Sequence, residues 1–376
     1  MPKPAVVQIV HGFLEGGSER QMVQLVKLLH ECGKYDVHVA TLGNGGVLRS
    51  QVERLPIPLI DFPLTSFYDA NMLHQMRKFV SYLRKHRIRL VHSHDFYSNI
   101  FGMNGSLLAG VRGRIASKRE TAGTRTPVQA RVERYVFRHV AHEVVANAAA
   151  VKDYLIHEGV PAEKIAVVHN GLDLSRFRQN GNAGQLLETL NLVSVRGRPV
   201  ITIVANFEHR VKDYPMLLRA AQRVKAEVKE AVFVLAGEGR LREETQRLAG
   251  ELGLGDSCLF IGRCGSVPQL LAASDICVLS SQAEGFSNSI LEYMAAGRAV
   301  VATDVGGASE AIVEGETGHL IKAGDDRAMA DRLISLLRDP ERRRAMGLSG
   351  RRLVEERFSC EKRLAVTSAL YQKFLD

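Results

Sequence analysis

Short apolar runs alternate with helical segments from one end of the 376-residue chain to the other. Apolar strands separated by helices are typical of parallel sheets that helices cover on both faces. In the first half the candidate strands are 5–10, 36–42, 58–62, 90–93, 114–117, 143–147 and 165–169. In the second half they are 199–206, 231–237, 258–262, 276–280, 299–303 and 319–321. The pattern predicts an α/β protein, with helices such as 19–32 and 71–86 between the strands.

The alternation stops and restarts around the Asn- and Gly-rich stretch 169–185, which we interpret as a linker. A chain of this length is long for one core, so two domains are expected. We predict two Rossmann-like domains, residues 1–180 and 181–359, facing each other across a cleft. Ligands of such sheets bind at the carboxyl ends of the strands, which places the predicted site in that cleft.

The cysteine and hydropathy patterns exclude several classes of protein. Five cysteines, odd in number and without a CxxC pair, indicate reduced thiols, neither a disulfide framework nor a zinc site. The sequence shows no cluster of metal ligands, and no apolar run approaches the roughly 20 residues needed to cross a bilayer. The N-terminus lacks the features of a secretory signal. We therefore expect a cytoplasmic protein.

The net charge of +9 lies entirely in the first half of the chain. Residues 1–180 contain 24 lysines and arginines against 15 acidic residues, whereas residues 181–376 contain 26 of each. Part of the excess lies in 77–90 and 131–139, which predicts an anionic partner, either a phosphate-bearing ligand or a membrane surface. A solvated basic helix face explains the same charge. No nucleic-acid-binding signature accompanies it.

A Gly-Gly pair follows the first predicted strand, in "HGFLEGGSERQMVQL" (11–25). Gly16 and Gly17 would let the backbone turn tightly and approach a ligand, and the helix that starts near Ser18 would offer free N–H groups to an anion. The spacing is not GxGxxG, and the second strand ends without an acidic ribose ligand, which disfavours a nicotinamide-dependent dehydrogenase. An ordinary strand-to-helix turn is the alternative interpretation.

Three cationic side chains follow the first strand of the second half, in "VANFEHRVKDYPMLLRAA" (204–221). His209, Arg210 and Lys212 occupy a predicted strand-to-helix loop, where a ligand at the strand ends would meet them. Arginine can fork onto phosphate oxygens and lysine can act as a point charge. The alternative interpretation is a solvated loop whose charge is incidental.

Two glutamates, Glu284 and Glu292, flank a polar turn in "EGFSNSILEYMAAG" (284–297). The turn is followed by a predicted helix that Gly297 closes, and the first amides of this helix would face an anion. A capping box between Ser289 and Glu292 explains the second glutamate structurally. A carboxylate pair of a glycosidase is a further alternative. Eight fully helical residues would separate the pair by about 12 Å, which is more than a glycosidase needs. Glu284 is expected to precede the helix, however, so the spacing alone does not exclude this alternative.

Taken together, these stretches resemble glycosyltransferase family 4, the retaining, nucleotide-sugar-dependent transferases of the GT-B fold. The resemblance covers nearly the whole chain. The stretches that carry it are 15–25, 91–102, 167–177, 211–221, 234–244 and 273–312. The last of them, with its E-x7-E core, is long and highly specific, whereas the Gly-Gly turn alone is not.

The resemblance implies that a single ligand joins the two glutamates. Glu284 would lie against the hydroxyls and the reacting face of the transferred sugar, and Glu292 would accept hydrogen bonds from the ribose hydroxyls. The amides that would bind the diphosphate between them are those of Phe286, Ser287, Asn288 and Ser289.

The resemblance assigns the other cationic and glycine residues to the same donor. The Gly16–Gly17 turn would close over the phosphates from the opposite domain. Arg210 and Lys212 would stabilise the leaving diphosphate, and Arg263 would border the base. UDP is the expected donor nucleotide.

The implied chemistry needs neither a metal nor a cofactor, because arginine, lysine and helix amides meet the developing phosphate charge. The acceptor attacks from the face that the leaving group departs, so that the anomeric configuration is retained. The phosphate itself takes the acceptor proton, and no protein nucleophile is required.

Two departures from the family pattern concern the phosphate and sugar contacts. Many members carry an arginine five residues before the phosphate lysine, where this chain has Phe207. Arg210 is therefore the only arginine of this loop that can contact the diphosphate. Many also have a histidine after the fifth strand, where this chain has Lys118 and Arg119. We regard these two residues and His94 as possible contacts to the sugar or to an anionic acceptor. A structural role is the alternative for His94.

The sequence therefore predicts a cytoplasmic glycosyltransferase, peripheral at the inner face of the membrane, that uses a nucleotide sugar and a glycan or lipid-linked acceptor. The first domain would hold the acceptor and the second the donor, and the C-terminal helix 360–376 would pack on the first domain. Two alternatives stay open at this point. One is a nucleotide-sugar epimerase or hydrolase of the same fold, and the other is a binding protein that does not catalyse.

Overall fold

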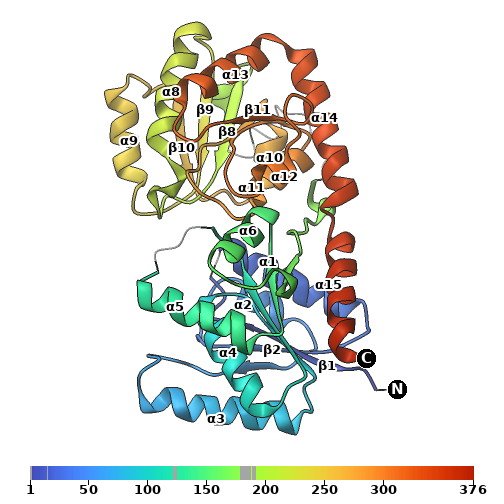
Figure 1. Ribbon diagram of the computed structural model, residues 1–376. Helices are drawn as coiled ribbons and strands as arrows, with labels where there is room; N and C mark the ends of the chain where they lie inside the picture. The colour runs from blue at the N-terminus through green and yellow to red at the C-terminus, as the bar shows by residue number, and fades with distance from the viewer. Residues whose placement is uncertain (1, 15, 122–124, 178–187, 189–191) are drawn as a thin grey trace. The chain divides into compact units, whose positions relative to one another are not determined.

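The computed structural model describes residues 2–14, 16–121, 125–177, 188 and 192–376 (Figure 1). The chain divides into two compact units. Unit 1 comprises Met1–Gly171 together with Cys360–Asp376, and unit 2 comprises Leu172–Ser359. Each unit has its own parallel sheet and its own hydrophobic core.

The sheet of unit 1 is built, within the described residues, from seven parallel strands in the order β3-β2-β1-β4-β5-β6-β7. The strands are β1 (Ala5–Val10), β2 (Asp36–Thr41), β3 (Leu59–Asp61), β4 (Leu90–Ser93), β5 (Gly113–Lys118), β6 (Glu143–Ala146) and β7 (Ile165–Val167). They confirm the predicted strands to within one or two residues. The order reverses between β1 and β4, so this is the topological switch point of the sheet, where ligands of Rossmann-like folds bind.

The helices of unit 1 cover both faces of this sheet. They are α1 (Gly17–Glu31), α2 (Arg49–Glu53), α3 (Ala70–Lys85), α4 (Phe96–Ala109), α5 (Pro127–Tyr135), α6 (Ala149–His157) and α15 (Cys360–Leu375), with the short helices η1 (Val136–Val140) and η2 (Ala162–Lys164). Helix α4 packs against both α3 and α5, so these three form one layer, whereas α15 contacts α1.

Local sequence signals set the ends of the α3–α4 layer. The Asp69 carboxylate caps α3 by accepting from the Met72 amide, and Asp95 and Ser98 form a capping box at the start of α4. Helix α4 ends at Gly110, whose φ of 77° lies in the left-handed region that glycine adopts most readily.

Aromatic packing joins α3 to α4 and to the sheet. The buried ring of Phe79 lies 5.2 Å from the ring of Phe62 and 5.3 Å from that of Phe101. Gly105 makes room for it, because a Cβ at this glycine would lie 2.5 Å from Cδ1 of Phe79. The position of α3 therefore depends on one ring in a close-fitting site.

The sheet of unit 2 has, among the residues described, six parallel strands in the order β10-β9-β8-β11-β12-β13. They are β8 (Val200–Val204), β9 (Val232–Ala236), β10 (Cys258–Gly262), β11 (Ile276–Leu279), β12 (Ala299–Thr303) and β13 (His319–Ile321). All six were predicted from the apolar runs. The switch point of this sheet lies between β8 and β11, which pair from Ile201 and Ile276 onward.

Helices surround the second sheet in the same manner. They are α8 (Tyr214–Glu227), α9 (Arg242–Glu251), α10 (Val267–Ala272), α11 (Asn288–Ala295), α12 (Ala308–Ala311), α13 (Asp326–Arg338) and α14 (Pro340–Arg357), with η3 (Leu174–Phe177), η4 (Val193–Val195) and η5 (Arg210–Lys212). Helices α8 and α13 pack together over one face of the sheet.

The change from unit 1 to unit 2 falls at Gly171–Leu172, earlier than the boundary expected at residue 180. The reason is that Leu172 already belongs to the second unit, since its amide donates to the Phe358 carbonyl over 2.8 Å and it forms a bridge with Ser359. Residue 180 itself lies outside the described residues. The C-terminal helix α15 returns to unit 1, where Tyr371 is fully buried.

The structure also bears on three expectations from the sequence, which concern the cysteines, metal sites and membrane-spanning segments. All five cysteines lie in the described part of the chain, and none of them forms a disulfide. Throughout the described part of the chain, no three His, Cys, Asp or Glu side chains gather in a group that could hold a metal ion. None of its helices there combines the length and apolarity that a membrane crossing requires.

Replacing Phe79 with alanine is expected to destabilise unit 1 by about 3–5 kcal/mol, because it leaves a cavity between two aromatic rings that cannot collapse fully. Urea unfolding followed by circular dichroism measures the change. Tyr68→Ala is the matched control, since this ring is 94% exposed and its loss is expected to change stability by less than about 0.5 kcal/mol. Equal effects of the two substitutions would contradict the packing argument.

Candidate functional site

The candidate site of unit 2 lies at the switch point, where the loops after β8 and β11 meet. Lys212 ends η5 in the first loop and Glu284 lies in the second. The Lys212 ammonium lies 2.6 Å from Oε1 of Glu284, and about one sixth of each side chain is exposed. The residues are 72 positions apart in sequence, and the adjacency of β8 and β11 brings them together.

Glu284 is held in place from two sides. The Ser281 hydroxyl donates to Oε1 of Glu284 over 2.7 Å, so this oxygen receives both a hydroxyl and an ammonium. Behind it, the loop after β12 approaches so closely that a Cβ at Gly306 would lie 2.2 Å from the Glu284 carbonyl oxygen. Gly306 also has a φ of 57°, so the backbone there requires glycine on two counts.

Lys212 is positioned through its backbone by the same loop. Its carbonyl accepts from the Ser280 hydroxyl over 2.7 Å. The next residue, Asp213, has a φ of 45° and caps α8 by accepting from the Met216 amide. The Gln282 side chain donates to the other carboxylate oxygen of Asp213 over 3.1 Å. The two loops are thus fastened to each other independently of the Lys212–Glu284 pair.

Arg210, predicted to act together with Lys212, is directed elsewhere. Its guanidinium forms a forked pair with Glu244 of α9, at 2.9 and 3.1 Å, and its side chain is 74% exposed. Helix α9 follows β9, which flanks β8 on the side opposite β11. Arg210 and Lys212 therefore point toward opposite neighbours of β8. The cause is Glu244, which binds the Arg210 guanidinium. Sequence spacing does not reveal this pair.

Helix α11 starts where the second loop ends, as the sequence predicts, and Gly297 follows it with a φ of 69°. Two side chains tether this helix to the end of β8: the Ser289 hydroxyl donates to the Val204 carbonyl over 2.9 Å, and the Val204 amide donates to the Tyr293 hydroxyl over 2.7 Å. The N-terminal amides of α11 therefore lie at the carboxyl ends of β8 and β11.

The capping-box interpretation of Glu292 is wrong. The residue that caps α11 is Ser287, not Ser289, and its side chain makes no capping hydrogen bond. The Ser289 hydroxyl instead bonds to the backbone of β8. Glu292 lies in the second turn of the helix and is buried, with 6% of its surface exposed.

The remaining predicted donor contacts in unit 2 occupy distinct positions. The ring of Phe286 is buried 5.2 Å from that of Phe358, so its side chain packs and only its backbone belongs to the loop. Asn288 is the first residue of α11 and is half-buried. Arg263 follows β10, and its amide donates to Glu238 over 3.2 Å.

The backbone at the Gly-Gly pair of unit 1 adopts no conformation that is reserved for glycine. Gly16 caps α1 with a φ of −87°, which any residue adopts, and Gly17 is the first helical residue. What the missing side chain provides is space: a Cβ at Gly16 would lie 2.2 Å from Oε2 of Glu19. The Glu19 carboxylate thus lies over the N-terminus of α1, where an anion is favoured. Burial raises the pKa of this carboxyl, and Asp95 adds to the effect.

The switch point of unit 1 is also closed by a contact between its two loops. The His11 amide, after β1, donates to Oδ2 of Asp95, after β4, over 2.6 Å. Oδ1 of Asp95 accepts from the Ser98 amide over 3.0 Å. One carboxylate therefore caps α4 and joins the two loops. The ring of Tyr97 lies 4.8 Å from that of His11.

A buried hydrogen-bond chain links His94 to the C-terminal helix. Nε2 of His94 lies 2.9 Å from Oε1 of Gln8, and Nε2 of Gln8 donates to the Tyr371 hydroxyl over 2.9 Å. That hydroxyl lies 2.7 Å from Nδ1 of His92, and Nε2 of His92 lies 2.8 Å from the Ser117 hydroxyl. The Gln8 carbonyl can only accept, so His94 carries its proton on Nε2, and its Nδ1 has no hydrogen-bond partner among the described residues.

Burial keeps both histidines neutral. The pKa values of His92 and His94 lie well below the ordinary 6.5, chiefly because burial disfavours the charged form. For His94 the next cause is His92, followed by Arg119. His94 therefore presents a neutral ring whose Nδ1 can accept a hydrogen bond. The Gln8 and Tyr371 side chains that impose this tautomer were not recognised in the sequence, because they are distant along the chain.

Lys118 and Arg119, adjacent at the end of β5, have different surroundings. The Lys118 ammonium is buried and lies 3.0 Å from Oε2 of Glu133 on α5, so it forms a buried ion pair, and its role as a ligand contact stays a prediction. Nη1 of Arg119 donates to the Asn170 side chain over 2.9 Å, whereas its Nε has no hydrogen-bond partner in the described set. Burial lowers the pKa of Arg119 to about 10, with Glu19 opposing the shift.

Two family models cover most of the chain. The model described as glycosyl transferases group 1 matches residues 191–353, which contain both glutamates and Lys212, and the model described as glycosyltransferase family 4 matches residues 15–176. The chain belongs to these glycosyltransferases. The first of these matches lies in unit 2, and the second covers most of unit 1.

The glycosyltransferase resembles both curated relatives and solved structures. It is 33% identical over 220 residues to N-acetyl-alpha-D-glucosaminyl L-malate synthase of Bacillus anthracis, covering 58% of this chain and 56% of the relative. The putative glycosyltransferase EpsD of Bacillus subtilis is 36% identical over 44% of this chain and 43% of its own length. The chain thus spans about half the length of these relatives.

Solved structures establish the GT-B fold of the glycosyltransferase. HepE of Anabaena, crystallised with UDP, superposes with a TM-score of 0.87 at 20% identity, covering 98% of this chain and all of that one. Sucrose-phosphate synthase of Thermosynechococcus elongatus superposes with a TM-score of 0.81 at 22% identity, and 99% of each chain is covered. At this level of identity the likeness concerns the fold alone.

Lys212 and Glu284 are expected to be coupled in stability, because each neutralises a partly buried charge of the other. In a double-mutant cycle of Lys212→Met and Glu284→Gln, we expect a coupling energy of about 0.5–3 kcal/mol from urea unfolding. The exposed pair Arg351–Glu355, at 2.9 Å on α14, is the control and should give about 0.3–0.5 kcal/mol. Additive effects at 212 and 284 would show that the pair contributes no stability.

The free energy of unfolding of the glycosyltransferase is expected to fall as the pH drops below 6.5. The unfolded chain then protonates His92 and His94, whereas the folded chain keeps them neutral because their pKa values are lowered. The slope amounts to at most about 1.4 kcal/mol per pH unit for each histidine. Urea unfolding between pH 7.5 and 5.5 measures it. His94→Gln should make the slope less steep by the contribution of one histidine. An unchanged slope would contradict the conclusion that His94 is neutral in the folded chain.

Proposed function

We propose that this glycosyltransferase moves a sugar from a nucleoside diphosphate sugar, with UDP as the nucleotide, to a glycan or lipid-linked acceptor, with retention of the anomeric configuration. The observation that carries the proposal is the Lys212–Glu284 pair at the switch point, beside the N-terminus of α11. These groups lie together at the carboxyl-terminal edge of the sheet, and each suits one feature of a sugar diphosphate. The carboxylate suits the sugar hydroxyls, the ammonium suits the phosphate charge, and the row of helix amides suits the phosphate oxygens.

The diphosphate is proposed to bind at the N-terminus of α11. Helix N-termini favour anions, and the residue that caps this helix uses no side chain to do so. Glu292, buried one turn into the helix, would then accept hydrogen bonds from the ribose hydroxyls. Arg263, which follows the edge strand β10, is proposed to border the base.

Lys212 is proposed to exchange its partner during the reaction. In the structure its ammonium faces Glu284, and a bound diphosphate would compete for the same charge. Glu284 keeps the Ser281 hydroxyl on the same oxygen, so its carboxylate stays in position when Lys212 turns toward phosphate. As the glycosidic bond breaks, the ammonium and the helix amides would stabilise the charge that develops on the leaving diphosphate. Arg210 would have to leave Glu244 to join them.

The acceptor is proposed to bind at unit 1, where Arg119 and His94 lie at the carboxyl ends of β5 and β4. The Nδ1 atom of His94 could accept a hydrogen bond from an acceptor hydroxyl, and the Arg119 guanidinium suits an anionic group. Names of relatives support this class of substrate. One is an N-acetylgalactosaminyltransferase of Campylobacter jejuni that acts on a diphospho-undecaprenol saccharide, at 29% identity over 52% of this chain.

UDP is favoured as the nucleotide because HepE of Anabaena was crystallised with UDP, with UDP and glucose, and with UDP-glucose. The proposed reaction draws its electrostatic stabilisation from Lys212 and backbone amides, and its proton acceptor is the departing phosphate. No metal or cofactor has a role in it. Retention follows if the acceptor attacks from the face that the diphosphate leaves.

Replacing Glu292 with glutamine is expected to weaken UDP binding about 10- to 100-fold. Hydrogen bonds to a charged acceptor contribute about 1.5–3 kcal/mol, and about 1.4 kcal/mol corresponds to a factor of ten. Calorimetric titration of UDP, GDP, ADP and NAD in the presence of EDTA measures the affinities. The exposed Glu243→Gln on α9 is the matched control and should bind UDP as the wild type does.

Thermal unfolding of the same variants separates binding from folding. A lower melting temperature of Glu292→Gln with unchanged UDP affinity would assign Glu292 a structural role only. Turnover of UDP-sugar with and without a saccharide acceptor, followed by NMR of the anomeric proton, tests the reaction itself. An inverted product, or sugar release that no acceptor accelerates, would overturn the proposed transfer.

A further inference from the structure

The α3–α4 segment carries an unusual excess of positive charge. From Ala70 to Arg119 the sequence contains ten lysines and arginines and one acidic residue, Asp95. Asp95 is already engaged, because its carboxylate caps α4 and accepts from the His11 amide. The cations of this segment therefore find no acidic counterpart within it.

The cations on α3 are also unpaired in space. Arg77, Lys78, Arg84 and Lys85 are all exposed, and within the described residues none of them forms an ion pair. By contrast, exposed arginines of unit 2 such as Arg338 pair with neighbouring carboxylates. One guanidinium nitrogen of Arg84 donates to the Leu108 carbonyl of α4 over 2.7 Å, and the residue as a whole is exposed. The surface of α3 is thus a concentrated, uncompensated positive charge.

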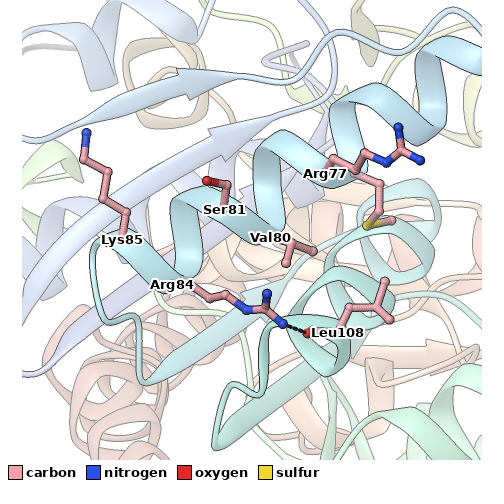
Figure 2. A pocket seen from close by; sticks show the side chains of 7 residues that line it. Arg77, Val80, Ser81, Arg84, Lys85 and Leu108 are labelled. Carbon is pink, nitrogen blue, oxygen red and sulfur yellow. Dashed lines mark hydrogen bonds between the residues drawn. The ribbon is translucent and has the colours of Figure 1, made fainter.

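Three of these cations line a groove between α3 and the C-terminal end of α4 (Figure 2). The groove has a volume of about 730 Å³ and opens to solvent. Figure 2 shows Arg77 and Lys85 toward the two ends of the α3 face, and Arg84 reaching across to Leu108. The side chains that line the groove are Arg77, Ser81, Arg84 and Lys85, with Met76, Val80 and Leu108 as its apolar part.

Large apolar side chains stand exposed on the same helical layer. Of the fifteen large hydrophobic residues that are exposed in the described structure, seven belong to α3, α4 and α5. One of them, Tyr97, lies against the His11 ring at the switch point, and the other six are Leu73, Leu107, Leu108, Val128, Val132 and Tyr135. The three on α5 are spaced four and three residues apart, so they form a stripe on one side of that helix. Apolar residues at this spacing normally face a core, yet here they face outward.

We propose that the α3–α5 face, defined by these four cations and six apolar side chains, docks on an anionic lipid surface. Lipid phosphates would enter the groove among Arg77, Arg84 and Lys85. The exposed leucines, valines and tyrosine would enter the boundary between headgroups and acyl chains, where such side chains are favoured. A nucleic acid would satisfy the cations but leave the apolar side chains in water, so the combination favours a bilayer.

Vesicle binding tests the inference on the full chain. We expect sedimentation with vesicles of phosphatidylcholine and phosphatidylglycerol, and little with phosphatidylcholine alone. Raising the salt from about 0.1 M to about 1 M shortens the screening length from about 10 Å to about 3 Å, so binding should fall steeply. The assay needs no nucleotide sugar. Its failure would leave the proposed transfer standing, and failure of the transfer would leave the docking standing.

Two sets of variants separate the contributions. Arg77→Gln, Arg84→Gln and Lys85→Gln combined should weaken binding about a hundredfold, because each cation near an anionic surface contributes roughly a factor of five. Arg342→Gln, Arg344→Gln and Arg352→Gln on α14 remove the same charge from unit 2 and should leave binding unchanged. Leu108→Ser with Val132→Ser should weaken binding several-fold at both salt concentrations. All of these side chains are exposed, and unchanged thermal unfolding confirms that the variants fold.

Four results would overturn the proposal. They are equal binding to neutral and anionic vesicles, no binding to either, equal losses for the α3 and α14 triple variants, and full binding by the Leu108 and Val132 variant. The last would show that the surface is a solvated basic face that adheres by charge alone. Displacement of the protein from vesicles by RNA at lower concentration than by soluble phosphatidylglycerol headgroup would instead assign the face to nucleic acid.

Discussion

The adjacency of β8 and β11 is the constraint on which the candidate site depends. In a parallel sheet the carboxyl ends of all strands share one edge, and the reversal of strand order leaves two loops diverging there with space between them. Lys212 and Glu284, 72 residues apart, meet at this point over 2.6 Å. The same geometry in unit 1 joins the His11 amide to Asp95, 84 residues away. Hydrogen bonds between the loops then hold charged side chains in positions that neither loop could maintain alone.

The two units fill this common geometry differently, and the difference has a physical basis. In unit 1 the N-terminus of α1 is covered by the chain's own carboxylate, Glu19, for which Gly16 leaves space. In unit 2 the residue that caps α11 contributes no side chain. An incoming phosphate would compete with Glu19 at α1 but with no side-chain cap at α11. This is why we assign the donor diphosphate to unit 2, and an acceptor to the buried arginine and histidine of unit 1.

The sequence predicted the strands, the start of α11 and the loop that carries Lys212, because apolar runs and glycine positions depend on neighbours a few residues away. It did not predict the directions of long side chains. Arg210 was expected beside Lys212, but Glu244 draws it toward α9. Lys118 was regarded as a possible ligand contact, and its buried pair with Glu133 was not foreseen. The partner of a long, flexible side chain is set by elements that the local pattern does not contain.

The sequence by itself determined the fold class, the strand positions and the family, since each follows from periodicity or from contiguous motifs. It also determined that the positive charge lies in the first half of the chain. Only the tertiary structure decided which charges remain uncompensated, as on α3, and which apolar residues stay exposed, as Leu108 does. It also decided the tautomer of His94, through Gln8 of β1 and Tyr371 of the distant helix α15. The physical reason is that burial, pairing and hydrogen bonding are set by contacts between segments far apart in sequence, and folding alone creates those contacts.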